Sequence, residues 1–296
     1  MIKKSGFVAI VGRPNVGKST LLNALVGQKV AIVANRPQTT RNRILGIVND
    51  GEAQMLFLDT PGLHRPKDKL GAYMMRQAEG AVRDVDAAVL VVEPTETVEE
   101  VERGIMERAK ADGFPIILAV NKIDTVEKPA LLPVIAAYAA AFDFAAIIPI
   151  SARTGDGLAE LKGEITRLLP EGPAYFPEDA YTDQTERQMV GELIREKALR
   201  LLDKEVPHGL AVEIERFIER EDGIVEIKAV IVCEKESHKG IIIGKGGAML
   251  KKIGSAARVD MERLLGCKVF LETFVKVRES WRDSERFLRS VGYNDK

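Results

Sequence analysis

Cysteine is scarce in this chain, and no hydrophobic run is long enough to cross a membrane. The 296 residues include two cysteines, Cys233 and Cys267. Each lies in an apolar stretch, so we expect two buried free thiols, whereas a disulfide framework or a zinc site would need more ligands at closer spacing. The longest apolar segment, residues 131–142, is too short for a bilayer. Met1 is followed by no cleavable signal. These absences predict a cytoplasmic protein.

An excess of one charge is also missing from the chain as a whole. Lysine and arginine number 43 against 44 acidic residues, which gives a net charge of −1. The distribution is uneven, because residues 238–289 hold twelve basic and six acidic residues and so carry +6. The rest of the chain is correspondingly acidic. A basic end on an acidic body favours a polyanionic partner for that end, although a solvated charged face gives the same pattern.

The most specific local signal is the stretch Gly12 to Ser19, which reads GRPNVGKS. An apolar run precedes it at residues 7–11, and a helical pattern follows at 20–25. Strand, G-x-x-x-x-G-K-S and helix together are the context of a phosphate-binding loop. In such a loop backbone N–H groups face a polyphosphate, Lys18 reaches its β- and γ-phosphates, and Ser19 binds Mg²⁺. An ordinary glycine turn would not need eight positions at fixed spacing.

Apolar runs and helical patterns alternate through the first half of the chain, which predicts a doubly wound α/β domain. Three further motifs follow predicted strands, and they are Asp59-Thr60-Pro61-Gly62, Asn121-Lys122-Ile123-Asp124 and Ser151-Ala152. Asp59 can hold Mg²⁺ through water, and the N–H of Gly62 can meet a γ-phosphate. The carboxylate of Asp124 can accept hydrogen bonds from N1–H and the amine of guanine, which adenine lacks. The N–H of Ala152 can contact guanine O6.

These motifs, in this order, resemble the translation-factor-related GTPases over residues 5–170. The resemblance implies GTP or GDP and Mg²⁺ as ligands, and hydrolysis of GTP to GDP and phosphate. It implies three groups of site residues. The nucleotide would contact Gly12, Asn15, Val16, Gly17, Lys18, Ser19, Thr20, Asp59, Gly62, Asn121, Lys122, Asp124, Ser151 and Ala152. The metal would be held by Ser19, Thr40 and Asp59, and Lys18, Thr40 and Gly62 would act in catalysis.

Two segments match the positions of nucleotide-dependent switches in this family. Residues 37–41 carry the threonine that closes over Mg²⁺, for which we favour Thr40 over Thr39. The second switch would run from Asp59 into residues 63–70. Leu63 occupies the position of a glutamine that orients the attacking water in Ras-type proteins, so another group must place the water. The chain resembles a subgroup that has this replacement and in which an asparagine at the Asn15 position accompanies K⁺. We therefore hypothesise slow hydrolysis stimulated by potassium.

The second half of the chain predicts a smaller α+β domain. The spacing of Asp183 and Glu186 is that of a capping box, which would open a helix reaching about residue 204. Two alternating strands at 210–218 and 224–233 are joined by a hairpin turn. A glycine loop, a helix over 248–265 and a strand over 269–277 follow.

This order resembles a type II KH domain, whose Gly-x-x-Gly loop allows a single-stranded backbone to approach closely. The RNA-contacting residues implied are Gly244, Lys245, Gly246, Gly247, Lys251 and Lys252. A second nucleotide loop is the alternative, and the absence of a Lys-Ser or Lys-Thr pair after these glycines argues against it. Residues 279–291 predict a C-terminal helix. Trp281 there could stack on a base, but packing on the domain core is favoured.

We therefore expect a GTP-binding domain at residues 1–172, a linker at 173–184 and a KH-type RNA-binding domain at 185–296. The combination resembles the bacterial Era-type GTPases. That resemblance implies a monomeric GTP-hydrolysing switch that binds the 3′ end of 16S rRNA and acts on the pre-30S or 30S ribosomal subunit. The alternative is a GTPase adaptor that associates peripherally with the inner membrane or acts in cell-cycle control. A metabolic NTPase is disfavoured by the guanine-reading motif.

Overall fold

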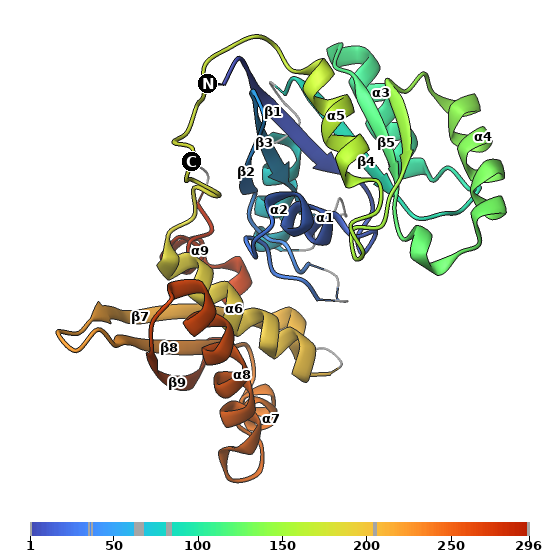
Figure 1. The fold of residues 1–296 in the computed structure, drawn as a ribbon. Coiled ribbons are helices and arrows are strands. Elements are labelled where there is room, and N and C mark those ends of the chain that lie inside the picture. The colour runs from blue at the N-terminus through green and yellow to red at the C-terminus, as the bar shows by residue number, and fades with distance from the viewer. Residues whose placement is uncertain are drawn as a thin grey trace. The chain divides into compact units, whose positions relative to one another are not determined.

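The protein forms two units of contacting residues, and the chain passes between them more than once. The computed structural model describes residues 2–34, 36, 38–61, 68–80, 85–203 and 206–294 (Figure 1). The first unit comprises Met1–Ala31, Thr40–Arg65 and Met74–Asp183. The second comprises Ile32–Thr39, Pro66–Tyr73 and Gln184–Lys296. Two short segments from the N-terminal half of the chain are therefore grouped with the C-terminal residues.

A six-stranded sheet forms the centre of the first unit. Its strands are β1 (Lys4–Val11), β2 (Ile44–Asp50), β3 (Ala53–Asp59), β4 (Ala87–Val92), β5 (Ile116–Val120) and β6 (Ala146–Pro149), in the order β2-β3-β1-β4-β5-β6. Only β2 among these strands runs antiparallel to its neighbour. The predicted doubly wound α/β domain is confirmed. Its carboxyl strand ends lie at one edge, where ligands bind in such sheets.

Helices cover both faces of this sheet because side chains alternate along each strand. From β1, Val8 and Ile10 belong to one apolar core, and Ala9 and Val11 belong to another. The first core includes residues of α1 (Lys18–Val26) and α5 (Leu158–Leu168). The second includes residues of α3 (Glu100–Asp112) and α4 (Leu131–Ala141). The remaining helix, α2 (Lys69–Gly80), starts in a segment grouped with the second unit.

Residues 173–182, which the sequence predicted as part of a linker, are hydrogen-bonded to strands of the first unit, and their last residues lie along the outer edge of β2. The N–H of Ile47 donates to the carbonyl of Tyr181 at 3.0 Å, and the hydroxyl of Thr182 donates to the carbonyl of Leu45 at 2.7 Å. The fully buried Gln54 accepts hydrogen bonds from the N–H groups at 175 and 176. We call residues 173–182 the strap. These hydrogen bonds hold it against the first unit.

The second unit has the KH fold that the sequence predicted. Its elements are α6 (Glu186–Leu201), β7 (Ala211–Glu219), β8 (Val225–Cys233), α7 (Glu236–Ile243), α8 (Ala248–Leu265), β9 (Val269–Val277) and α9 (Glu285–Ser290). The sheet order is β7-β8-β9, with β7 antiparallel and β9 parallel to β8. Alternate residues of β8 pack against α6 and α8 in one apolar core.

Two details of the second half differ from the sequence prediction. The helix α6 is capped by Thr185 and Gln188, because each residue's side chain accepts from the other's backbone N–H, at 3.3 and 3.0 Å. The predicted box at Asp183 and Glu186 is therefore wrong. The predicted C-terminal helix is broken at Ser284, which caps the shorter α9.

The remaining predictions for single residues concern packing. Cys233 is buried as expected, whereas Cys267 is only partly buried, and both are free. Trp281 packs inside the second unit, as favoured, because its side chain is fully buried and its Nε1–H donates to the carbonyl of Gly209 at 2.9 Å.

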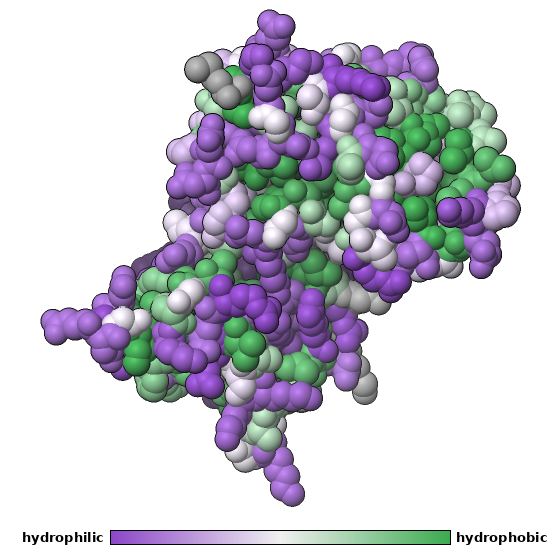
Figure 2. All heavy atoms as spheres, viewed as in Figure 1, coloured by the Kyte–Doolittle hydropathy of each residue, from purple (hydrophilic) through white to green (hydrophobic). Residues whose placement is uncertain are grey.

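The surface carries polar side chains over most of the face shown in Figure 2, with smaller apolar groups between them. Within the described part of the chain, no helix combines the length and apolarity that a membrane span requires.

Candidate functional site

The loop between β1 and α1 adopts backbone conformations that most side chains do not tolerate. Gly12 has φ of 143° and Gly17 has φ of 106°. A Cβ on Gly12 would lie 2.3 Å from the carbonyl oxygen of Val91, and one on Gly17 would lie 2.3 Å from Nδ2 of Asn121. Both positions therefore require glycine. The loop then leads into the N-terminus of α1, where backbone N–H groups favour a phosphate.

Lys18 opens α1 with its ammonium group turned back over this loop. Its Nζ donates to the carbonyls of Gly12 at 2.9 Å and Arg13 at 2.8 Å. Burial lowers the pKa of Lys18, while the charge of Asp59 acts in the opposite direction. The ammonium group is thus held where the loop can receive a polyphosphate.

Three oxygen-bearing side chains converge beside Lys18. The hydroxyl of Ser19 donates to Oδ2 of Asp59 at 2.6 Å, and it lies 2.9 Å from the hydroxyl of Thr40. The other oxygen of Asp59, Oδ1, is buried and has no hydrogen-bond partner among the described residues. Burial raises the pKa of Asp59, and the charge of Lys18 opposes this shift. A carboxylate with a free oxygen next to two hydroxyls suits Mg²⁺, which prefers oxygen ligands.

The neighbouring Thr39 does not join this cluster. Its hydroxyl donates to the carbonyl of Arg36 at 2.7 Å, within its own segment. Of the two threonines, Thr40 is therefore the one that lies beside Ser19 and Asp59, and its role as a metal ligand stays a prediction.

Asn121 and Lys122 connect the loop after β5 to the phosphate-binding loop. The side-chain amide of Asn121 donates to the carbonyl of Val16 at 2.8 Å and accepts from the N–H of Ala152 at 3.0 Å. Nζ of Lys122 donates to the carbonyl of Asn15 at 2.9 Å and also contacts the carboxylate of Glu93. Three loops that lie far apart in the sequence are thereby fixed to one another.

The carboxylate of Asp124 lies at the end of the same motif. Oδ1 accepts from the hydroxyl of Ser151 at 2.6 Å, and Oδ2 pairs with Arg153 at 2.5 Å. The hydrogen bond from Ser151, with a further contribution from Arg153, lowers the pKa of Asp124. An ionised carboxylate here can accept the two N–H groups of a guanine edge. Arg153 and Glu93 were not among the residues predicted for the site. Arg153 directly follows the Ser151-Ala152 motif, whereas Glu93 has no local signal.

The remaining residues of the predicted nucleotide site fall into two groups, one that the structure describes and one that it does not. Thr20 lies in the first turn of α1 and is partly buried. Gly62 and Leu63, with residues 64–67 of the predicted second switch, lie outside the described residues.

The glycine loop of the second unit lies between α7 and α8. Gly244 has φ of 72°, and a Cβ there would lie 2.8 Å from that of Met249, so this turn requires glycine. Lys245 and Gly246 are exposed. Lys251 and Lys252 are also exposed, one turn into α8. All six residues predicted to contact RNA therefore lie on one loop and the helix that it opens. We call residues 244–247 the GKGG loop.

Comparisons with known proteins match both units. The family described as "50S ribosome-binding GTPase" matches residues 7–122, and the family described as "KH domain" matches residues 205–282. The protein named GTPase Era from Ruminiclostridium cellulolyticum is 51% identical over 293 residues, which cover 99% of this chain and 98% of that protein. The chain belongs to the Era family of GTPases. GTPase Era from Geobacter metallireducens is 52% identical over 98% of both chains.

Solved Era structures match the whole fold as well. A variant of Aquifex aeolicus Era bound to GDP and AlF₄⁻ covers 99% of this chain and 100% of that chain, with 41% identity and a TM-score of 0.94. Era in complex with MgGDPNP and nucleotides 1506–1542 of 16S ribosomal RNA has 40% identity, the same coverage and a TM-score of 0.94. This Era-family chain is thus a GTPase that binds GTP and GDP and carries a KH domain.

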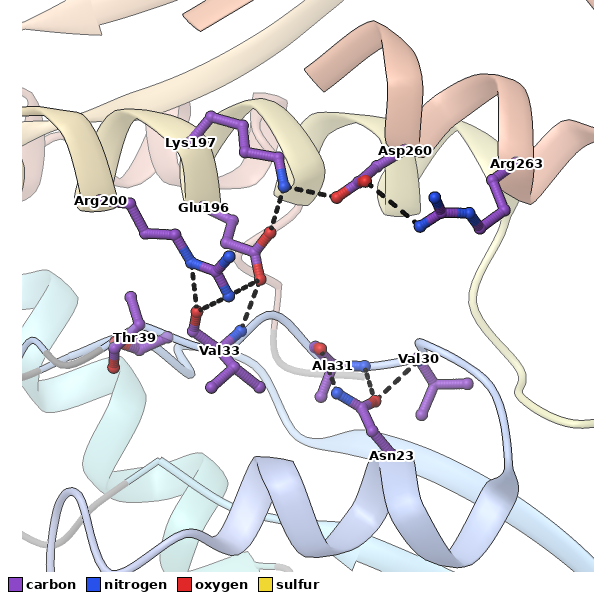
Figure 3. Close-up of polar contacts among 11 residues, drawn as sticks. Asn23, Val30, Ala31, Val33, Thr39, Glu196, Lys197, Arg200, Asp260 and Arg263 are labelled. Carbon is purple, nitrogen blue, oxygen red and sulfur yellow. Dashed lines mark hydrogen bonds and ion pairs between the residues drawn. The ribbon is translucent and has the colours of Figure 1, made fainter. Parts of the chain in front are cut away.

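In this Era-family chain, Val33, which precedes the first predicted switch, and Thr39 within that switch are bound to α6 in the second unit. The N–H of Val33 donates to the carboxylate of Glu196 at 2.9 Å, and Nε of Arg200 donates to the carbonyl of Val33 at 2.9 Å (Figure 3). The fully buried Arg195 donates to the carbonyl of Thr39. The adjacent Thr40 belongs to the first unit. The boundary between the units therefore crosses this switch at one peptide bond.

The same stretch of α6 also reaches the helix that follows the GKGG loop. Lys197 bonds to Glu196 at 3.0 Å and to Asp260 of α8, which in turn pairs with Arg263 (Figure 3). Glu196 thus contacts the backbone of Val33, just before the switch. Through Lys197 it also contacts α8, the candidate RNA-binding helix. No sequence motif predicted these residues of α6.

Proposed function

We propose that this chain is a GTP-driven molecular switch that binds the 3′ region of 16S rRNA and acts in assembly and maturation of the 30S subunit. The observation that carries the proposal is the likeness, over 99% of the chain, to an Era structure solved with nucleotides 1506–1542 of that RNA. The exposed GKGG loop at the start of α8 supports it, because such a loop admits a single-stranded backbone. In this proposal the protein acts as a monomer in the cytoplasm.

At the nucleotide site, each candidate residue has a role that its geometry suits. Lys18 and the loop N–H groups bind the β- and γ-phosphates, together with the N–H of Gly62. Asp124 selects guanine by accepting its two donors. Ser19, Thr40 and Asp59 would hold Mg²⁺. When bound, this ion neutralises charge that develops on the phosphates during hydrolysis.

Placement of the attacking water requires a different group from the usual glutamine, since Leu63 has no polar side chain. We propose that K⁺ binds beside the phosphates near Asn15, which is exposed on the phosphate-binding loop. Its amide oxygen is a ligand of the kind that alkali cations accept. The cation would add positive charge where an arginine finger acts in other GTPases.

In this proposal, the first switch transmits the difference between the GTP-bound and GDP-bound states to the RNA-binding site. With GTP and Mg²⁺ bound, Thr40 would be held at the metal, and the preceding residue, Thr39, is bound to α6 by Arg195. A movement of Thr40 would therefore alter the Thr39–Arg195 hydrogen bond and, through the contact of Lys197 with Asp260, the position of α8. Hydrolysis frees Thr40 and favours release of the RNA. The coupling is reciprocal and is typically about 1–3 kcal/mol.

The proposal is tested by the affinity for a single-stranded RNA that copies the 3′ end of 16S rRNA. Protein loaded with a non-hydrolysable GTP analogue should bind it several-fold more tightly than protein loaded with GDP. The variant Lys245→Asp with Gly246→Asp should lose binding in both states, because it puts negative charge where the RNA backbone passes.

A matched control is Lys268→Asp with Gly266→Asp, which makes the same change in charge on the same unit. Gly246 and Gly266 both have positive φ, of 59° and 67°, and a Cβ on either meets open space. The control should retain RNA binding. If both double variants lost RNA binding equally, the loss would reflect the overall charge of the unit and not a contact with the GKGG loop. If every form of the protein bound RNA weakly and the protein still co-sedimented with liposomes after RNase treatment, a membrane adaptor would be supported instead.

A further inference from the structure

Glu102 is a buried carboxylate that belongs to none of the nucleotide-binding motifs. It lies on α3 and is fully buried, in a helix whose residues Ile105 and Met106 contribute to the apolar core. An ionised carboxylate in such surroundings is costly unless strong hydrogen bonds satisfy it. Its partners therefore indicate what the residue does.

The carboxylate of Glu102 joins three separate parts of the first unit. Oε1 accepts from Nε of Arg13 at 2.8 Å. Oε2 accepts from the hydroxyl of Tyr138 on α4 at 2.7 Å, and from the N–H of Glu99 at 3.0 Å. Both oxygens are thus satisfied, and one of the three donors comes from the phosphate-binding loop.

Arg13 transmits this contact to the residue that meets the phosphates. Its side chain is bound to Glu102, while its own carbonyl accepts from Nζ of Lys18 at 2.8 Å. The side chain also lies 3.6 Å from the carboxylate of Glu99. Because Arg13 faces α3 through these contacts, its backbone is fixed at the point where it holds Lys18.

The charges on this network agree with the geometry. Burial raises the pKa of Tyr138, and the hydrogen bond to Glu102 raises it further, so the hydroxyl stays a donor. Burial alone would lower the pKa of Arg13. The hydrogen bond and the negative charge of Glu102 outweigh burial, so the pKa of Arg13 is raised. Both shifts favour the protonated, donating form of these side chains.

We propose that Arg13, Glu102 and Tyr138 form a clamp that positions the phosphate-binding loop, and with it Lys18, for GTP binding and hydrolysis. These are positioning residues, since the clamp acts through the backbone of Arg13. Small displacements of a positioned group are costly in catalysis, and an error of about 1 Å can lower a rate by about a hundredfold. The clamp acts at the GTPase site, and it can be tested without RNA.

The test compares Arg13→Gln, Glu102→Gln and Tyr138→Phe with the parent protein. Each variant should release a fluorescent GDP analogue faster, by about tenfold for Arg13→Gln, the equivalent of about 1.4 kcal/mol. Each should also lower kcat at saturating GTP, because Lys18 is then misplaced in the occupied site. Rates are measured at a temperature where circular dichroism shows that the variant is folded.

Arg108→Gln is the matched control, because Arg108 lies on the same helix and forms an exposed ion pair with Asp112. It should leave GDP release and kcat unchanged. The double variant Arg13→Gln with Glu102→Gln should be little worse than either single one, since residues that act as one unit are not additive.

Two results would overturn the clamp. In the first, the variants melt at lower temperature yet keep the parent's GDP release rate and kcat, which is the behaviour of a purely structural network. In the second, the effects of Arg13→Gln and Glu102→Gln on GDP release add in full. If Glu102→Gln does not fold, Arg13→Gln combined with Tyr138→Phe provides the same cycle.

Discussion

At the scale of single residues, many polar side chains of the nucleotide site hold backbone in place. Asn121 joins the phosphate-binding loop to the loop after β6, and Lys122 bonds to the carbonyl of Asn15. Asn15 itself has φ of 65°, a conformation that asparagine tolerates better than most residues. Its backbone is therefore held by Lys122 while its side chain remains exposed for a ligand.

This arrangement makes the potassium proposal testable at one residue. GTP hydrolysis should be several-fold faster in potassium buffer than in sodium buffer of equal ionic strength. Asn15→Gly should abolish the difference while leaving the sodium rate near that of the parent. Glycine accepts the positive φ and retains the carbonyl bound by Lys122, so the loop itself is preserved. Equal rates in the two buffers, or stimulation that persists in Asn15→Gly, would contradict the proposal.

At the scale of elements, α6 begins at a capping box that its own first turn forms. Thr185 and Gln188 satisfy two backbone N–H groups that would otherwise lack partners. The sequence contains two overlapping boxes with the same spacing, one at Asp183 and one at Thr185. Spacing alone could not distinguish them, and the structure selects the second.

The choice of cap predicts unequal costs for two similar substitutions. Thr185→Ala should lower the free energy of unfolding of the KH unit by about 1 kcal/mol. Asp183→Ala should change it by less than about 0.5 kcal/mol, as surface substitutions usually do. Urea unfolding followed by tryptophan fluorescence isolates this unit, because Trp281 is the single tryptophan of the chain and is buried there. A larger loss in Asp183→Ala would restore the box first predicted.

At the scale of the whole molecule, the short segment around the first predicted switch contacts both α6 and the candidate metal ligands. The backbone of Val33 and Thr39 is held by α6, while the hydroxyl of Thr40 meets Ser19 and Asp59. The coupling proposed between GTP and RNA then depends on a few hydrogen bonds to main-chain atoms. Those bonds can be removed from the α6 side without touching either ligand site.

Arg200→Ala should weaken this coupling. Arg200 is partly exposed and donates to the carbonyl of Val33, so its loss should leave the fold intact. We expect the ratio of RNA affinities in the GTP and GDP states to fall towards one, with the GDP-state affinity little changed. Lys268→Ala, which removes an ion pair with Glu262 outside this network, should keep the parent's ratio. Parent-like coupling in Arg200→Ala would show that the nucleotide acts by another route.

The sequence predicted the parts of this molecule that local chemistry determines. The phosphate-binding loop follows from Gly12 and Gly17, whose conformations exclude other residues, and β4 and β5 follow from uninterrupted apolar runs. Contacts between distant residues were not predictable in this way. Arg13 and Glu102 are 89 residues apart, and Glu102 and Tyr138 are 36 apart. Any buried glutamate or tyrosine in an apolar pattern would give the same local signal.

The strap has a consequence for how other molecules can engage the first unit. β2 is the outermost strand on its side of the sheet, and such an edge ordinarily offers free N–H and C=O groups to an extended peptide. Here the chain itself takes part of that position, pairing Gly46 with Thr182. Recruitment of a partner by strand addition at this edge would require the strap to peel away. Proteins that recognise the edge in its native form must therefore read side chains, and the same cover protects the sheet from joining a second copy edge to edge.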